Sequence, residues 1–359
     1  MPTKIPSDHW SVFSEGQPRL SPAIKRLPGH ALFNARHASG HPAPDRSDNN
    51  NQDTEYTMRT SISRFIAAAG FAAAALFSTA ASADTVVYSG SDGKVINAQL
   101  TVGGTSWNVD WYIPSTPAAA LVTVQHGFSR GCGNYRDTSK RIMGRGLMVL
   151  CLNAPMSGGN PTLAAQFADL IASRTMVAPG GVAVPANTIV GGHSAGGHFA
   201  SAVGARLAVV GYPHLKGAVL FDPVAAEGFT NNLVAISNFG QRPVYAVTAN
   251  GGICNQFNNA YGALRQISNT ARSNARDGFV GVQLTSGSTH VDSEGNNTDV
   301  IGYTACLNLP PKSSNTAYLR DLSAAWANDL ARGTRDANAY PGGAYVNTLI
   351  AQKKAKTIN

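Results

Sequence analysis

The pentapeptide Gly192-His193-Ser194-Ala195-Gly196 matches the pattern G-x-S-x-G. In this pattern a sharp turn between a strand and a helix carries the serine, and glycine is favoured beside it because the turn is tight. An apolar segment, NTIVG, precedes the pattern, and a small-residue segment, GGHFASAV, follows it. This strand–turn–helix setting predicts that Ser194 is a nucleophile. The alternative is a glycine-rich turn in some other strand–helix unit.

A serine hydroxyl is a weak nucleophile until a base takes its proton. His290 fits this role because it lies in a polar loop, residues 285–292, after the last apolar strand segment, 278–284. Four other histidines fit it less well. Two lie in or beside the serine turn, one lies in the loop expected to shape the oxyanion site, and one precedes the acid candidate: His193, His198, His126 and His214.

A carboxylate must orient the histidine and stabilise its cation. Asp222 follows the strand segment 217–221, and the next strand segment ends at Ala249-Asn250 without a carboxylate. Asp292 is too close to His290 in sequence to lie behind its ring. A helix or turn cap is the alternative role for either aspartate. The chain order Ser, Asp, His is that of α/β-hydrolases.

Two backbone N–H groups are expected to bind the oxyanion that forms during acyl transfer. One is that of Ala195, directly after the nucleophile. The other belongs to the sequence His126-Gly127-Phe128-Ser129, and we assign it to Phe128. The Phe128 side chain has two alternatives: it lines the acyl site, or it packs under its own loop.

Four short motifs, HGF, GHSAGG, FDPV and THVD, resemble those of chlorophyllases and of the related polyester hydrolases, cutinase-like enzymes and platelet-activating-factor acetylhydrolases. The resemblance covers about residues 119–292. It implies the α/β-hydrolase fold, a Ser194–Asp222–His290 triad and ester substrates, and the expected reaction needs no cofactor. Chlorophyllases usually carry a basic residue where Ala195 stands, and polyester hydrolases place the acid one strand later. We therefore do not infer that chlorophyll or polyethylene terephthalate is a substrate of this protein.

Apolar strand and helix segments alternate from residue 85 onward. This alternation predicts an α/β fold with a mainly parallel central sheet covered by helices on both faces. The expected strands are 86–88, 94–102, 107–113, 119–125, 147–152, 188–191, 217–221, 244–248 and 278–284, and the first three are expected as antiparallel hairpins. The expected helices are 134–145, 162–174, 197–210, 255–272 and 317–332.

Residues 84–359 form one α/β-hydrolase domain by this interpretation. Only about twenty residues separate Asp222 from the strand at Val244, a connection of ordinary length. A separate cap domain does not fit there. The site is therefore expected to be open and to accept bulky or polymeric esters.

The composition excludes some classes of function. The chain has 359 residues, 43% hydrophobic and 13% charged, and its formal charge of +8 is not gathered into a Lys/Arg cluster of the nucleic-acid-binding type. The acidic stretch from Asp292 to Asp299 does not fit an EF-hand loop. We interpret it as a polar loop and predict no metal site.

The first 83 residues are not expected to be part of the folded domain. Met58 starts a segment with a basic Arg59 and Arg64, an apolar run at 65–77, and a small-residue cleavage site at 81–83. These features predict a secretory signal peptide over 58–83, cut before Asp84. A membrane anchor or a buried helix is the alternative. Residues 1–57 read as disordered or as a misassigned start. The mature protein is expected to be secreted or periplasmic, without a stable membrane anchor.

The chain has four cysteines and no C-x-x-C pair, which argues against zinc ribbons and thioredoxin-type sites. In an exported protein an even number of cysteines suggests disulfides. Three pairings are possible. We favour Cys132–Cys151 and Cys254–Cys306, because the expected fold brings each pair near the ends of the same sheet. Free buried thiols are the alternative.

The residues therefore predict an exported serine hydrolase that cleaves carboxylic esters through an acyl-enzyme. An amidase or peptidase with the same triad is one rival. A non-catalytic binding protein on a hydrolase scaffold is the rival from another class. The oligomeric state is left open by the sequence.

Overall fold

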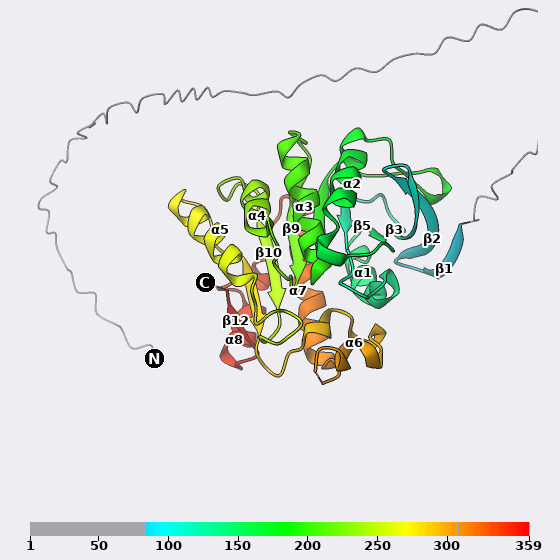
Figure 1. The fold of residues 1–359 in the computed structure, drawn as a ribbon. Helices are drawn as coiled ribbons and strands as arrows, with labels where there is room; N and C mark the ends of the chain where they lie inside the picture. Colours follow the sequence, from blue (N-terminus) through cyan, green and yellow to red (C-terminus); the bar gives the residue numbers. More distant parts are fainter. Residues whose placement is uncertain (1–83, 308, 359) are drawn as a thin grey trace, which may run out of the picture. The chain divides into compact units, whose positions relative to one another are not determined.

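Ten strands form one sheet in the part of the chain that the computed structural model describes, residues 84–307 and 309–358 (Figure 1). Their order across the sheet is β1-β2-β3-β5-β4-β8-β9-β10-β11-β12. The strands are β1 Thr85–Gly90, β2 Gly93–Val102, β3 Thr105–Pro114, β4 Leu121–Thr123, β5 Met148–Leu152, β8 Thr188–His193, β9 Leu215–Phe221, β10 Val244–Thr248, β11 Gly281–Leu284 and β12 Ala355–Thr357. The short strands β6 Val177–Ala178 and β7 Val182–Ala183 pair separately.

The central strands β5, β4, β8, β9, β10 and β11 run parallel. Strands β1, β2 and β3 are joined as antiparallel hairpins, as the sequence predicted, and β12 pairs antiparallel with β11 at the other edge. Parallel strands place all their carboxyl ends at one edge of the sheet, where open α/β folds bind ligands. The loops after β4, β8, β9, β10 and β11 therefore meet at that edge.

Helices cover both faces of the sheet (Figure 1). Side chains of α2, α3, α4 and α5 are buried with one face, and those of α1, α7 and α8 with the other. The helices are α1 Arg136–Met143, α2 Pro161–Ser173, α3 Ala195–Val209, α4 Phe229–Ser237, α5 Tyr261–Ser273, α6 Val300–Thr304, α7 Ser313–Arg332 and α8 Ala344–Ala351.

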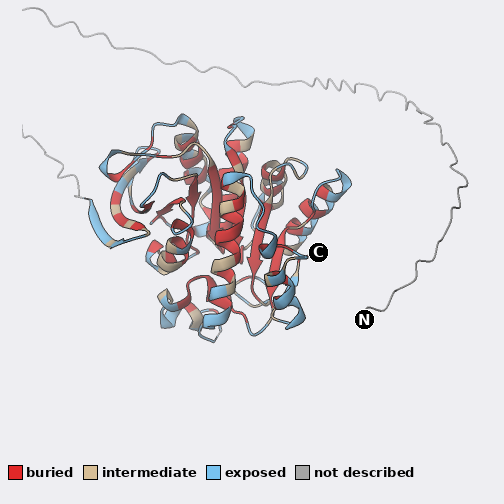
Figure 2. Ribbon diagram, turned by 180° about the vertical axis from the view of Figure 1, so that it is seen from behind, coloured by how far each residue is buried: buried red, intermediate tan, exposed pale blue. Residues whose placement is uncertain are grey.

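The apolar segments of the sequence form the hydrophobic core. All six residues of β8 are buried, and α3 buries its small residues against the sheet, which lets the helix lie close to the strands. Figure 2 shows the buried residues in the strands and on the helix faces that meet them, with exposed residues on the peripheral loops. The central strands β4, β5, β8, β10 and β11, which are buried along their whole length, give the loops at their carboxyl ends a rigid base.

Several boundaries differ from the sequence prediction. Helix α3 begins at Ala195 instead of 197, because the chain turns at Ser194 itself. Helix α5 begins at Tyr261 instead of 255, because the preceding residues form turns. Helix α4 and strand β12 were not predicted. Apolar residues at helical spacing, Phe229, Leu233 and Ile236, mark α4 in the sequence, whereas the lysine-rich stretch around β12 masks its strand pattern.

The connection between β9 and β10 contains only α4, which packs on α3 and α5 as a sheet-covering helix. Every residue between these two strands is described, and no cap domain is inserted there, as the sequence predicted. Among the described residues, no helix combines the length and apolar character needed to cross a bilayer. The predicted signal peptide and the segment before it lie outside the described residues.

Candidate active site

Ser194 lies on a tight turn between β8 and α3, with φ of 55° and ψ of −127°. The backbone approaches so closely here that a Cβ atom at Gly192 would lie 2.2 Å from the Gly196 carbonyl oxygen. A Cβ atom at Gly196 would lie 2.2 Å from the His126 carbonyl oxygen. Both glycines of the motif are thus required by sterics, and the strained serine backbone is typical of a functional turn.

The loop after β4 packs against this turn. A Cβ atom at Gly127 would lie 3.0 Å from Ser194 Cβ, and the His126 backbone adjoins Gly196. The next residue, Phe128, is therefore carried on the same side as the start of α3, where Ala195 lies. Its side chain is 62% exposed, so the alternative that it packs under its own loop is wrong.

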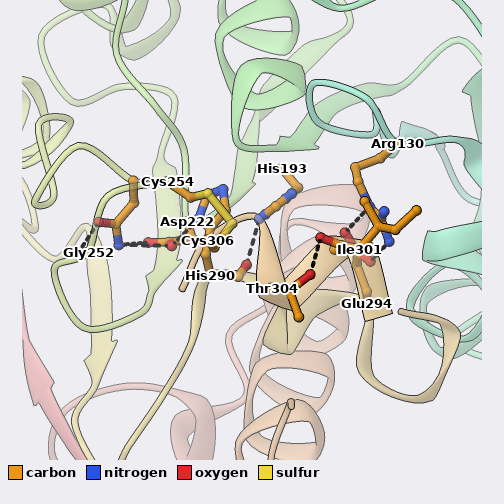
Figure 3. Close-up of a disulfide and its surroundings, with 12 residues drawn as sticks. Arg130, His193, Asp222, Gly252, Cys254, His290, Glu294, Ile301, Thr304 and Cys306 are labelled. Carbon is orange, nitrogen blue, oxygen red and sulfur yellow. Dashed lines mark hydrogen bonds and ion pairs between the residues drawn. A yellow bond between two sulfur atoms is a disulfide. The ribbon is translucent and has the colours of Figure 1, made fainter. Parts of the chain in front are cut away.

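His290 and Asp222 are joined directly. His290 Nδ1 lies 2.6 Å from Asp222 Oδ2, and both side chains are buried (Figure 3). Because a carboxylate accepts, Nδ1 carries the proton and Nε2 is left as the atom that can take one. Asp222 directly follows β9, as predicted, and His290 begins the short 3-10 turn His290–Ser293 after β11. Residues 68 positions apart in sequence meet here.

Ser194 lies beside this pair. Its backbone N–H donates to the carbonyl oxygen of Phe221, the residue before Asp222, at 3.2 Å. The ring of the preceding residue, His193, lies 4.3 Å from that of His290. The contacts of the described residues do not include a direct bond from Ser194 Oγ to His290. Catalytic hydrogen bonds of this kind often tighten only in the complex with substrate.

The contacts of the four competing histidines with the described residues do not include a bond to Asp222. Both ring nitrogens of His193 have partners, the Tyr135 hydroxyl and the His290 carbonyl oxygen. Burial lowers the pKa of His126 and of His198, and the ring of His198 stacks on Phe229. His214 lies on the surface.

The acidic stretch after His290 is used within the protein. Asp292 caps the turn at Thr289, where its carboxylate accepts from the Thr289 N–H at 2.9 Å. Glu294 and Asp299 both pair with Arg130, which follows Phe128 by two residues. Figure 3 shows Arg130 beside Glu294. These pairs tie the segment after the histidine to the loop expected to bind the oxyanion.

Both favoured disulfides are present, Cys132–Cys151 and Cys254–Cys306. The second joins the loop after β10 to the segment after α6, beside the Asp222–His290 pair (Figure 3). Sequence reasoning missed Asn255, whose side-chain amide donates to Asp222, and Tyr135, which binds His193. No pattern marks either residue, because each partner lies more than thirty positions away.

The strand order, the short connection between β9 and β10, and the tight turn at Ser194 between β8 and α3 define the α/β-hydrolase fold. No protein-family model and no curated protein sequence matches the chain. Its fold is similar to that of carboxyl esterase 2 of the fungus Tuber melanosporum, with 14% identity, a TM-score of 0.47, and coverage of 68% of this chain and 88% of that one. It is also similar to the carboxylesterase EstE1 from a metagenomic library, with 18% identity, a TM-score of 0.45, and coverage of 70% and 92%. A third similar structure is a thermostable esterase from Pseudomonas putida ECU1011, with 15% identity, a TM-score of 0.44, and coverage of 70% and 86%.

Proposed function

We propose that this protein is a serine hydrolase of carboxylic esters, with Ser194 as nucleophile, His290 as base and Asp222 as the acid. The observation that carries the proposal is the buried 2.6 Å bond between His290 Nδ1 and Asp222 Oδ2, placed beside a strained serine turn. A buried histidine–carboxylate pair next to such a turn suits acyl transfer.

The chemistry follows from this placement. Ser194 Oγ attacks the ester carbonyl carbon while His290 Nε2 takes the hydroxyl proton. The N–H groups of Ala195 and Phe128 stabilise the oxyanion. His290 then returns the proton to the departing alcohol, which leaves an acyl-enzyme. A water molecule, deprotonated by the same histidine, hydrolyses the acyl-enzyme and restores Ser194.

Replacement of Ser194 by alanine tests the proposal. We expect S194A to lose at least about 10⁴-fold in kcat on ester substrates and to keep its melting temperature, because the hydroxyl is the reacting group and the fold does not depend on it. The matched control is S273A, which removes an exposed serine at the end of α5. Undiminished ester hydrolysis by S194A would refute the assignment.

Two rivals use the same scaffold. An amidase or peptidase would share the triad, so paired ester and amide substrates with the same acyl group separate the two. A binding protein would keep the fold without a reactive serine. A fluorophosphonate probe distinguishes it: we expect labelling of the wild type at Ser194 and no labelling of S194A.

Bulky or polymeric esters are the finer part of the proposal. Apolar side chains are exposed on three segments at the carboxyl edge of the sheet: Phe128, Phe257, Ile301 and Leu307. The Arg130–Asp299 pair and the Cys254–Cys306 disulfide hold these segments together. We call these four residues the apolar rim. An apolar rim around an uncapped site favours substrates with large apolar surfaces.

Two phenylalanines provide a matched test of the rim. Phe257 lies on it, and Phe239 follows α4 at the opposite edge of the sheet. Both are exposed and both have a left-handed backbone, with φ of 55° and 57°. We expect F257S to raise KM for long-chain or polymeric esters several-fold and to leave short soluble esters unchanged, and F239S to change neither. Equal effects of the two variants on KM would show that the apolar rim does not bind the substrate.

Export is also part of the proposal. Two disulfides suit an oxidising compartment. Together with the signal-peptide pattern, they support secretion or passage to the periplasm with a mature N-terminus at Asp84. N-terminal sequencing of the exported protein tests this. A mature terminus well upstream of Asp84 would contradict it.

A further inference from the structure

His193 lies between the nucleophile and the base. It immediately precedes Ser194 at the end of β8, and its side chain is almost completely buried. Its Nε2 atom lies 2.7 Å from the backbone carbonyl oxygen of His290 (Figure 3). Its Nδ1 atom is hydrogen-bonded to the hydroxyl of Tyr135, at the start of α1. One ring thus connects the nucleophile turn, the base loop and the helix α1 region.

The carbonyl oxygen of His290 and the hydroxyl of Tyr135 determine which nitrogen of His193 carries a proton. A carbonyl oxygen only accepts, so His193 Nε2 carries a proton and donates to His290. Burial, with the electrostatic effect of the neighbouring His290 as a second cause, lowers the pKa of His193 well below its usual value, so the ring is neutral and Nδ1 accepts. Burial raises the pKa of Tyr135, which therefore keeps its proton.

Tyr135 has a second neighbour, Glu294 Oε1, at 3.2 Å, but only one proton to donate. The closer contact is to His193 Nδ1. Glu294 already accepts two hydrogen bonds from Arg130. The Tyr135 proton is thus assigned to His193, and donation runs from Tyr135 through His193 to the backbone of His290.

We infer that His193 is a positioning residue, which sets the spacing between Ser194 and His290 through the carbonyl oxygen of His290. The inference rests on the proposed triad. Asp222 holds only the ring of His290, at Nδ1, while other bonds hold the neighbours of His290 in the loop, such as that from the Thr289 N–H to Asp292. The bonds that Asp222 makes do not include the backbone of His290. The bond from His193 fixes that backbone to the residue next to the nucleophile. Such spacing matters because a displacement of about 1 Å can cost about 100-fold in rate.

His193 itself is excluded as the base. Both of its nitrogens are occupied, one by Tyr135 and one by His290. Its ring therefore has no free lone pair for the Ser194 proton. Its contribution to catalysis must act through the position of His290.

Three variants separate positioning from general structure. H193F keeps an aromatic ring and removes the donor. H193Q keeps an N–H group near the place of Nε2. H198F is the matched control. His198 is buried like His193, but it lies on α3 and its ring contacts Phe229 instead of His290. We expect H193F to lose about 10- to 100-fold in kcat with KM changed less than about threefold, H193Q to recover part of the loss, and H198F to retain the wild-type kcat.

The labelling rate with a fluorophosphonate is measured alongside, since it reports Ser194 reactivity without a natural substrate. If the wild type is not labelled, the proposed function fails. If the wild type and H193F are labelled equally fast, the positioning role fails while the function stands. A loss in H193F that H193Q does not relieve, or an equal loss in H198F, also overturns the inference.

If H193F does not fold, Y135F is the variant that tests the inference, because it removes the hydroxyl that donates to His193 Nδ1 and keeps the ring. We expect Y135F to lower kcat less than H193F does and to slow labelling in proportion. If a folded Y135F has the wild-type kcat and labelling rate, the hydrogen bond from Tyr135 does not help His193 to position His290, and this part of the inference is overturned.

Discussion

The side-chain amide nitrogen of Asn255 lies 3.0 Å from Oδ2 and 3.3 Å from Oδ1 of Asp222, the carboxylate that holds His290. The backbone N–H of Ala249 donates to Oδ1 at 2.9 Å. Asn255 is buried, and its own oxygen accepts from the N–H of Gly252 at 2.8 Å. The orientation of Asp222 therefore depends on the loop after β10.

Removal of this amide is expected to disturb the acid. We predict that N255A lowers kcat about 10-fold and destabilises the fold by about 1–3 kcal/mol, because a buried carboxylate loses a donor. N259A is the control, since Asn259 lies on the same loop region but binds the backbone of Ala225. Ester kinetics and denaturant unfolding measure both effects. Wild-type kcat in N255A would show that Asp222 does not need the amide.

The disulfide next to Asn255 should affect activity as well as stability. Cys254 precedes Asn255, and the bridge to Cys306 closes 52 residues, compared with 19 for Cys132–Cys151. From loop entropy alone, loss of the longer bridge costs about 4 kcal/mol and loss of the shorter about 3 kcal/mol. We predict that C254S/C306S also lowers kcat at temperatures where it is still folded, and more than C132S/C151S does. Equal kcat in the two double variants would show that the Cys254–Cys306 bridge contributes to stability but has no particular effect on activity.

The parts of the fold that could be predicted from sequence are those with local signals. The serine turn is marked by glycines that its own backbone requires, and β8 and α3 by their apolar and small residues. The pairing of Asp222 with His290 followed from chain order, since each residue ends or follows a strand of the same parallel sheet.

The supporting residues could not be predicted in this way. Asn255, Tyr135 and Arg130 act on partners that are far away in sequence, so their roles exist only once the loops are folded together. An asparagine in a turn or a tyrosine before a helix has many uses that are local. Only the tertiary structure shows which group each of these side chains binds.

A buried ion pair joins the loop of Phe128 to the loop of His290. Arg130 binds both carboxylate oxygens of Glu294, whose side chain is fully buried. We predict that R130M destabilises the protein by about 3–5 kcal/mol, because Glu294 is left as an unpaired buried charge. R130M/E294Q should recover part of this loss, since the charge is then removed. Denaturant unfolding of the two single variants and the double variant gives the coupling energy. Additive losses would mean that the two groups do not depend on each other.

The carboxyl group of Asp292 should make stability depend on pH. Burial raises its pKa from 3.8 to about 6, partly opposed by hydrogen bonds from Thr289. The native state therefore binds a proton more tightly than the unfolded state does. The stability that this group contributes is fully present below about pH 3.8 and is lost as the pH rises through about 6.

D292N removes this titration and keeps an oxygen that can accept from the Thr289 N–H. We predict that the difference in unfolding free energy between D292N and the wild type shifts by up to about 3 kcal/mol between pH 3.5 and pH 7, in favour of the variant at the higher pH. Urea unfolding at intervals across this range measures the difference, and all other titrating groups cancel in the comparison. If the two curves run parallel, the carboxyl group of Asp292 has the same proton affinity in the folded and the unfolded chain, and the raised pKa is wrong.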